Sequence, residues 1–173
     1  EGLDATGKTV VILVNDPGFA TQDPNVFSGN TMTYYGRWTY KFEEAARQGA
    51  AAALIVHQTA PAAYGWETVR NSWTGTQFNL QSADGNADRV AIEGWMTEET
   101  TRTLFDRAGL DFDALAEQAT TGTLRPVDMD MRLTTSVSNE LRFSESRNVA
   151  ALLRGSEAPD EYLVYMAQSD HFV

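Results

Sequence analysis

The chain has 173 residues, and 24 acidic side chains against 13 basic ones leave it a formal charge of −11. Its 42% of hydrophobic residues can build a packed core, which a disordered chain lacks. No cluster of Lys and Arg offers a footprint for a phosphate backbone, so nucleic acid is excluded as a partner. The lack of Cys excludes disulfides, thiolate zinc sites and cysteine nucleophiles. The longest apolar run, residues 50–56, is far below the roughly 20 residues that cross a bilayer, so we expect no membrane span.

The first part of the sequence predicts a strand, a helix and a second strand. Residues 8–14 are almost all β-branched or aliphatic, and the turn at 15–18 ends the run. Residues 40–48 have a helical period, with Gly49 as the stop signal. Residues 50–57 follow as a second buried strand. Such an arrangement within about fifty residues predicts a βαβ unit with parallel strands and a right-handed crossover.

Two long stretches, residues 19–40 and 61–88, have no sustained period. They contain large aromatic side chains: Tyr34, Tyr35, Trp38, Tyr40, Trp66 and Trp73. The simpler interpretation is that these side chains form the core of the two loops, which otherwise lack aliphatic residues. The functional interpretation is that some of them form an apolar rim for binding, because aromatic residues dominate binding hot spots. The rim candidates are Tyr35, Trp38, Trp66 and Trp73.

A third strand and two helices follow. Residues 89–95 predict the strand, and Thr97 is a suitable N-cap for the next helix, which has Glu98 and Glu99 in its first turn. Residues 111–119 predict another short helix.

Two polar features favour structural interpretations. Residues 84–88 resemble the first half of a calcium loop, but the twelfth position is Trp95 where that loop requires Glu, so the stretch predicts a polar turn. His57 ends the second strand without a nucleophile motif such as G-x-S-x-G, so we expect a strand-end histidine held by backbone groups.

After Pro126 the pattern changes, and we place a domain boundary there, with one domain over 1–126 and an incomplete tail over 127–173. The tail reads as three strands without a helix. Residues 129–135 alternate apolar with polar side chains, while 147–153 and 162–167 are apolar runs. Strands with unfilled edges pair with other strands, so the tail predicts partner strands or a homodimer.

The sequence from Lys8 to Val14, a loop, and then the sequence from Lys41 to Val56 resemble a protease-associated domain. The resemblance rests mainly on a predicted helix that ends in the pattern A-x-x-x-G-A-x-A and is followed directly by the next strand. The strand over 89–92 and the helix after Thr97 fit the same family. The resemblance implies an α/β fold, a βαβ sandwich or open barrel with two or three short helices.

The tail resembles the opening of the catalytic domain of di-zinc aminopeptidases of the glutamate carboxypeptidase and transferrin receptor-like group. Residues 147–156 match a strand of pattern N-V-x-x-x-x-x-G-S, and residues 159–167 match the strand that delivers the first metal ligand. The tail is then the beginning of a peptidase α/β domain, with a β-hairpin as its first part.

The sequence departs from that family at the metal ligand. The family's strand ends in a His-x-Asp triplet, and here the triplet is Gln168-Ser169-Asp170, followed by His171. A Gln amide is a poor zinc ligand beside imidazole. Asp170 matches the family's catalytic Asp position, while His171 should point to the opposite face of the strand. We therefore expect no metal site and no cofactor in this chain, with the remaining ligands lying downstream of Val173.

The resemblance implies the non-catalytic region of a secreted or periplasmic zinc aminopeptidase. Its role would be to shape substrate access or to contact peptides or a peptidase catalytic domain. The parent enzyme would hydrolyse N-terminal residues of peptides with zinc, and this chain alone is predicted to be inactive. The alternative is a stand-alone peptide- or protein-binding module derived from an inactive peptidase, which Gln168 supports. Further Asp, Glu and His ligands encoded downstream of Val173 would favour the enzyme.

Overall fold

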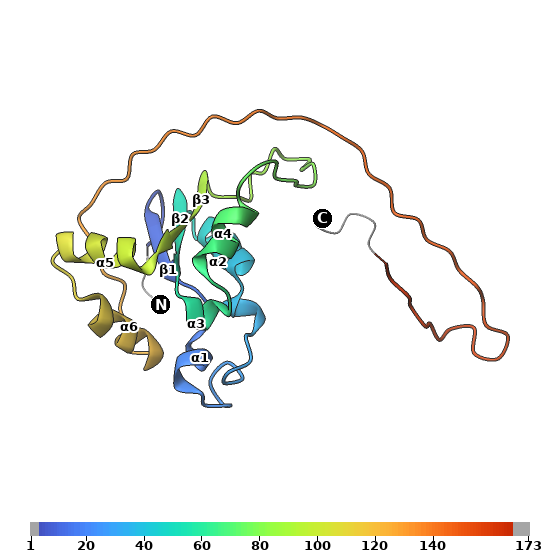
Figure 1. The fold of residues 1–173 in the computed structure, drawn as a ribbon, viewed down its shortest axis with the longest axis horizontal. Helices are drawn as coiled ribbons and strands as arrows, with labels where there is room; N and C mark the ends of the chain where they lie inside the picture. Colours follow the sequence, from blue (N-terminus) through green and yellow to red (C-terminus); the bar gives the residue numbers. More distant parts are fainter. Residues whose placement is uncertain (1–3, 168–173) are drawn as a thin grey trace. The chain divides into compact units, whose positions relative to one another are not determined.

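The computed structural model describes residues 4–167. The chain divides into two units, the first ending at Thr134 and the second beginning at Thr135. The helices and strands of the described residues all belong to the first unit (Figure 1). The domain boundary expected at Pro126 remains a prediction.

Three parallel strands form the sheet, in the order β1-β2-β3. They are β1 (Thr9–Leu13), β2 (Ala52–His57) and β3 (Ile92–Thr97). The register aligns Ile12 with Ile55, and Ile55 with Trp95. The α/β class and the parallel pairing predicted from the sequence are confirmed. The third strand begins later than predicted, at Ile92, and continues to the N-cap of the next helix.

The three longer helices follow the local signals in the sequence. They are α2 (Trp38–Arg47), α5 (Glu98–Arg107) and α6 (Phe112–Thr120). The hydroxyl of Thr97 accepts a hydrogen bond from the Thr100 N–H at 3.1 Å, which confirms the predicted N-cap of α5. Gly49, which follows α2, has φ +74°, a left-handed conformation that favours glycine and lets the chain turn into β2.

Four short helical turns lie within the two stretches predicted as loops, 19–40 and 61–88, or begin just before them. They are α1 (Pro17–Thr21), the 3-10 turn η1 (Tyr34–Gly36), α3 (Thr59–Ala62) and α4 (Trp66–Ser72). Segments of this length span two turns at most and produce no hydrophobic period, so the sequence pattern missed them. Contacts between residues distant in the sequence, such as Asn15 with Pro61 and Asp16 with Thr33, hold parts of these segments in place.

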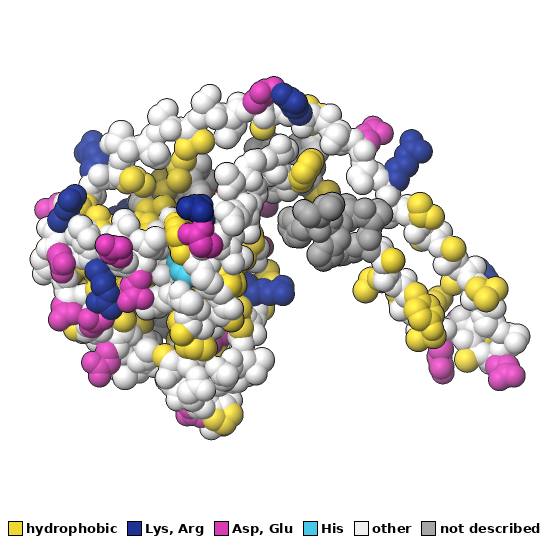
Figure 2. Space-filling model, in the orientation of Figure 1, with side chains coloured by type: hydrophobic (Ala, Val, Ile, Leu, Met, Phe, Trp, Pro, Cys, Tyr) yellow, Lys and Arg dark blue, Asp and Glu magenta, His cyan; other side chains and the backbone are white. Residues whose placement is uncertain are grey.

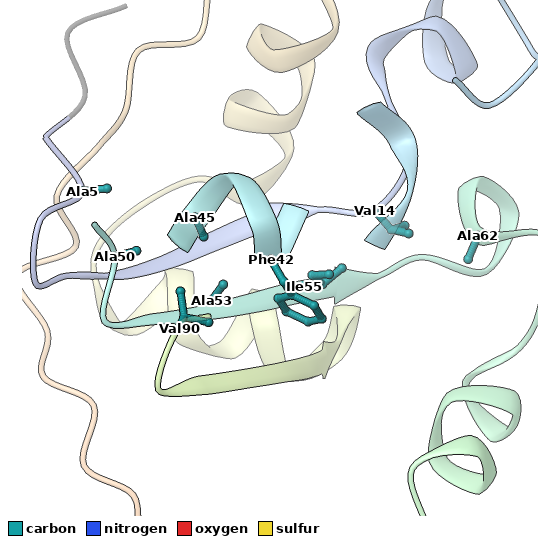
Figure 3. Packing of buried hydrophobic residues seen from close by; sticks show 9 residues of the cluster. All are labelled: Ala5, Val14, Phe42, Ala45, Ala50, Ala53, Ile55, Ala62 and Val90. Atoms are coloured by element: carbon teal, nitrogen blue, oxygen red, sulfur yellow. The ribbon is translucent and has the colours of Figure 1, made fainter. Parts of the chain in front are cut away.

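The core lies against β2, the central strand. Phe42 and Ala45 of α2 point onto Ala53 and Ile55 of β2 (Figure 3). Successive residues of a strand face opposite sides, and Ile55 and its neighbour Val56 are both fully buried, so both faces of the sheet are covered. Figure 1 shows α2 and α5 on opposite sides of the sheet. The first unit is therefore a three-layer α/β body with a largely buried central strand.

The tail differs from the prediction. The described residues of 127–167 contain no strand, whereas the sequence predicted three. Apolar side chains of this stretch stand in solvent, and Val149 and Leu153 are each 97% exposed. The physical reason is that period-2 alternation and apolar runs show that a segment is suited to a sheet, but a strand exists only when a neighbour completes its hydrogen-bond ladder. The expected β-hairpin is therefore corrected to an extended segment without regular pairing.

Candidate binding surface

The carboxyl edge of the sheet, where open α/β sheets bind ligands, is filled by the chain itself. The Asn15 amide donates to the Pro61 carbonyl at 2.7 Å, and a ring nitrogen of His57 lies 3.0 Å from the Tyr64 carbonyl oxygen. His57 is 4% exposed, and the Tyr64 and Trp66 rings lie beside it. The prediction of a strand-end histidine held by backbone groups is confirmed. Residues from 58–66 therefore cover this edge of the sheet.

A buried carboxylate organises the loop that follows β1. Asp16 is 8% exposed, and its oxygens accept hydrogen bonds from the Gly18 N–H, the Thr33 N–H and the Thr33 hydroxyl at 3.1, 3.0 and 2.8 Å. Through Thr33, Asp16 ties the far end of the loop to the end of β1. We call Asp16 and these donors the Asp16 hub. The sequence pattern over 15–18 predicts only a turn, although Asp before Pro is also a helix N-cap signal.

The loop held by this hub presents the tyrosine cluster, which consists of Phe27, Tyr34, Tyr35 and Tyr40. Their rings meet edge to face, with centroid distances of 5.1 Å for Tyr35–Tyr40, 5.3 Å for Tyr34–Tyr40 and 6.1 Å for Phe27–Tyr35. Tyr34 and Tyr35 are 53% and 54% exposed. The Tyr34 hydroxyl donates to Glu43 at 2.9 Å, and this hydrogen bond raises the pKa of Tyr34. Tyr34 and Tyr35 therefore pack on neighbouring rings while about half of each residue's surface stays exposed.

A second group, the tryptophan cluster, consists of Trp38, Trp73 and Trp95. The ring centroid of Trp38 lies 5.7 Å from that of Trp73 and 6.3 Å from that of Trp95. Trp38 and Trp73 are 37% and 41% exposed, whereas Trp95 is partly buried against the core. Trp38 also packs on Phe42 at 6.1 Å. Two exposed indoles from separate segments thus stand together on a buried aromatic base.

The structure separates the four predicted rim candidates. Trp38 and Trp73 lie in the tryptophan cluster, Tyr35 lies in the tyrosine cluster, and Trp66 is half-buried with its ring 5.7 Å from that of His57. Sequence analysis missed Trp95 as a member, and the only signal available was its place near the end of a strand. The predicted Asp170, together with Gln168 and His171, lies outside the described residues.

Lys41 introduces a charge beneath the tyrosine cluster. Its amine donates to the Tyr35 carbonyl at 3.5 Å, and the side chain is half-buried. Burial lowers the pKa of the Lys41 ammonium to about 8, and the negative charge of Asp16 opposes that shift. The Lys41 ammonium is therefore partly desolvated, and within residues 4–167 no carboxylate forms a salt bridge with it.

Replacing Lys41 by Met should stabilise the fold at neutral pH. Below pH 8 the amine is charged in both the folded and the unfolded chain, so folding carries the full cost of burying it. Between about 8 and the ordinary value of 10.5, the unfolded chain keeps the proton while the folded chain releases it, so the stability of the unchanged protein rises with pH. We expect Lys41→Met to raise the free energy of unfolding by roughly 1–2 kcal/mol at neutral pH and to lose this advantage as the pH rises.

Urea titrations over that pH range measure the effect. Lys8→Met is the matched control, because Lys8 is exposed and its amine pairs with Asp128 at 3.2 Å. The control should show no advantage that fades with pH. An advantage of Lys41→Met that stays constant across the range would show that burial of charge is not its cause.

Among residues 4–167, no three side chains of His, Asp or Glu come together as a metal-binding group. Residues 84–88 form the expected polar turn, in which the Asp84 carboxylate accepts the Asn86 N–H at 3.1 Å. The helices within the described part of the chain are all too short or too polar to span a membrane.

Comparison with protein-family models, curated proteins and solved structures returns no match to this chain.

Proposed function

We propose that this chain is the non-catalytic, protease-associated part of a zinc-dependent aminopeptidase, acting outside the cytoplasm. Its first unit binds extended peptide segments, either substrates or loops of a catalytic domain, through the tryptophan and tyrosine clusters. The observation that carries this proposal is the pair of exposed indoles, Trp38 and Trp73, held side by side on a rigid α/β body.

The energetic argument is that these rings are exposed and yet fixed. Large aromatic side chains stabilise an interface most when they lose little freedom on binding. Trp38 is already anchored by Phe42 and Trp95 below it, so binding immobilises it at small cost in entropy. The surface is suited to contact with apolar and aromatic side chains of a peptide.

The non-catalytic assignment rests on the surroundings of His57. A general base needs an accessible ring nitrogen within reach of the group that it deprotonates. His57 is buried, one ring nitrogen faces a backbone carbonyl, and aromatic rings lie around it. In the proposed parent enzyme, zinc would activate water in the catalytic domain, and the present residues would act on access to that site.

The stand-alone binding module is the second candidate. It uses the same aromatic surface and differs in the absence of a catalytic partner. Its support is Gln168, which occupies the position of the first zinc ligand in the aminopeptidase resemblance.

A peptide titration followed by NMR tests the binding surface. The chain has four tryptophans, so four indole N–H signals report on the site. A tryptic digest of an unfolded protein is the probe, and we expect the Trp38 and Trp73 signals to shift more than those of Trp66 and Trp95. Trp38→Ala and Trp73→Ala should each weaken binding by about tenfold while the fold stays intact.

Phe78→Ala is the matched control, because Phe78 is an aromatic residue of the same unit, 83% exposed and outside both clusters. It should leave peptide binding unchanged. If the fold is lost in the Trp variants, Trp38→Phe and Trp73→Phe keep the packing and isolate the contribution of the indole. No shift at any indole signal would contradict the peptide-binding role, and release of N-terminal residues by the chain with added zinc would contradict the non-catalytic role.

A further inference from the structure

Lys41 places a cation beneath the tyrosine cluster. Among the described residues, the half-buried basic side chains are Lys41 and Arg102. Arg102 contacts two carboxylates at 2.7 Å each, and Figure 2 shows several other basic side chains of the first unit next to acidic ones. Within residues 4–167 Lys41 forms no salt bridge, and its amine makes one long hydrogen bond, 3.5 Å, to the Tyr35 carbonyl. Buried cations are normally paired with anions, so this amine is suited to a further anionic partner.

Keeping this cation costs the fold stability. Burial lowers the pKa of the Lys41 ammonium to about 8, so at neutral pH the folded chain holds a charge that is partly removed from water. Methionine retains an apolar chain of similar length without the charge, which is why Lys41→Met is expected to stabilise the fold. Groups that weaken a fold and have a displaced pKa concentrate at functional sites, because binding or chemistry requires them there. Lys41 is therefore better explained by binding than by packing.

The Lys41 amine and the rings of the tyrosine cluster come largely from one short segment, residues 34–41. Side chains of a helix lean toward its N-terminus, so Lys41, near the start of α2, reaches back to the carbonyl of Tyr35 in η1. The ring of Tyr35 packs on that of Tyr40 with a centroid distance of 5.1 Å, and Tyr35 is 54% exposed. A peptide lying on the tyrosine cluster would therefore pass close to the ammonium. Aromatic surroundings strengthen an ionic hydrogen bond there relative to one in water.

We propose that Lys41 binds a carboxylate of the peptide held by this surface, from either an acidic side chain or the C-terminus. The inference rests on the proposed peptide-binding function and names the class of peptide that is selected. The net charge of −11 acts against acidic ligands in general, so a preference for such a peptide has to come from a local cation. A carboxylate fits better than a phosphate, because its single charge balances the ammonium. A phosphate would leave excess negative charge near Asp16 and Glu43.

Three hexapeptides test the proposal by titration of the full chain, followed by the NMR ring signals of Tyr34 and Tyr35. Each peptide contains two Phe residues. The first has one Glu and capped ends, the second has Gln in place of the Glu, and the third is the Gln peptide with a free carboxyl terminus. We expect the unchanged chain to bind at least one carboxylate-bearing peptide about tenfold more tightly than the capped Gln peptide. The first and third peptides distinguish a side-chain carboxylate from a terminal one.

Lys41→Met removes the ammonium in a variant that is expected to be more stable than the unchanged chain, so loss of folding does not confuse the result. It should bind all three peptides with equal affinity. Lys8→Met, which removes an exposed amine paired with Asp128, should keep the tenfold preference. Equal binding of the three peptides by the unchanged chain, or a preference that survives Lys41→Met, would overturn the role of Lys41 and leave aromatic peptide binding in place. No binding of any peptide would contradict the proposed function and this inference with it.

Discussion

Asp16→Ala should cost about 2–4 kcal/mol of the free energy of unfolding, the largest effect expected for a single substitution in the loop after β1. The substitution removes the acceptor of three hydrogen bonds and leaves the Gly18 N–H, the Thr33 N–H and the Thr33 hydroxyl without their partner. Buried donors left unpaired carry their full desolvation cost. It also removes the N-cap of α1.

Urea denaturation followed by circular dichroism measures this loss. Asp23→Ala is the matched control, since Asp23 is exposed and its carboxylate accepts local hydrogen bonds from the backbone and side chain of Asn25, two residues on. We expect the control to lose at most about 1 kcal/mol. Equal losses in the two variants would mean that the Asp16 hub does not hold the loop.

The structural consequence of Asp16→Ala reaches the proposed binding surface. Thr33 immediately precedes Tyr34, so the hub fixes the start of η1 and with it the tyrosine cluster. We expect the dispersed ring signals of Tyr34 and Tyr35 to collapse toward unfolded values in the variant, while the core signals near Ile55 persist. Asp16 is thus a positioning residue for the surface and makes no contact with a ligand.

Gly18→Ala should destabilise the fold by about 2–3 kcal/mol through overpacking. A Cβ atom at this position would collide with the carbonyl oxygen of Val26 and lie 2.7 Å from that of Gly29. Both obstacles are backbone atoms, so they yield only if the loop moves as a whole. The expected result is a lower midpoint in urea together with the same loss of tyrosine ring dispersion as in Asp16→Ala.

Gly65→Ala is the control for this substitution. A Cβ atom at Gly65 would meet no heavy atom within 4 Å, and its φ of −78° suits any residue. We expect a change of less than about 1 kcal/mol, set by the N-cap preference alone. If Gly18→Ala were as well tolerated as Gly65→Ala, the close approach of the loop to α1 would be refuted.

Some of the aromatic side chains of the candidate site could be predicted from the sequence. The sequence identified Trp38 and Trp73 as members of a group with either a packing or a binding role. In the structure Trp38 packs on Trp95 and keeps 37% of its surface exposed, and the binding role stays a prediction. A ring shared between core and surface has no signature in sequence, since its exposure depends on which distant segments cover it.

The sequence by itself determined the features that depend on near neighbours. The apolar runs within 8–14 and 50–57, the cap at Thr97 and the stop at Gly49 are local signals. They predicted the strands, the longer helices and the parallel βαβ order. Tertiary structure alone decided which segments meet: Asp16 with Thr33, Trp38 with Trp73, and residues 58–66 over the carboxyl edge. It also decided that the described residues of 127–167 form no strand. The physical reason is that a paired strand or an aromatic cluster requires contacts between residues distant in the chain. Local propensity describes only the backbone conformation that each residue favours.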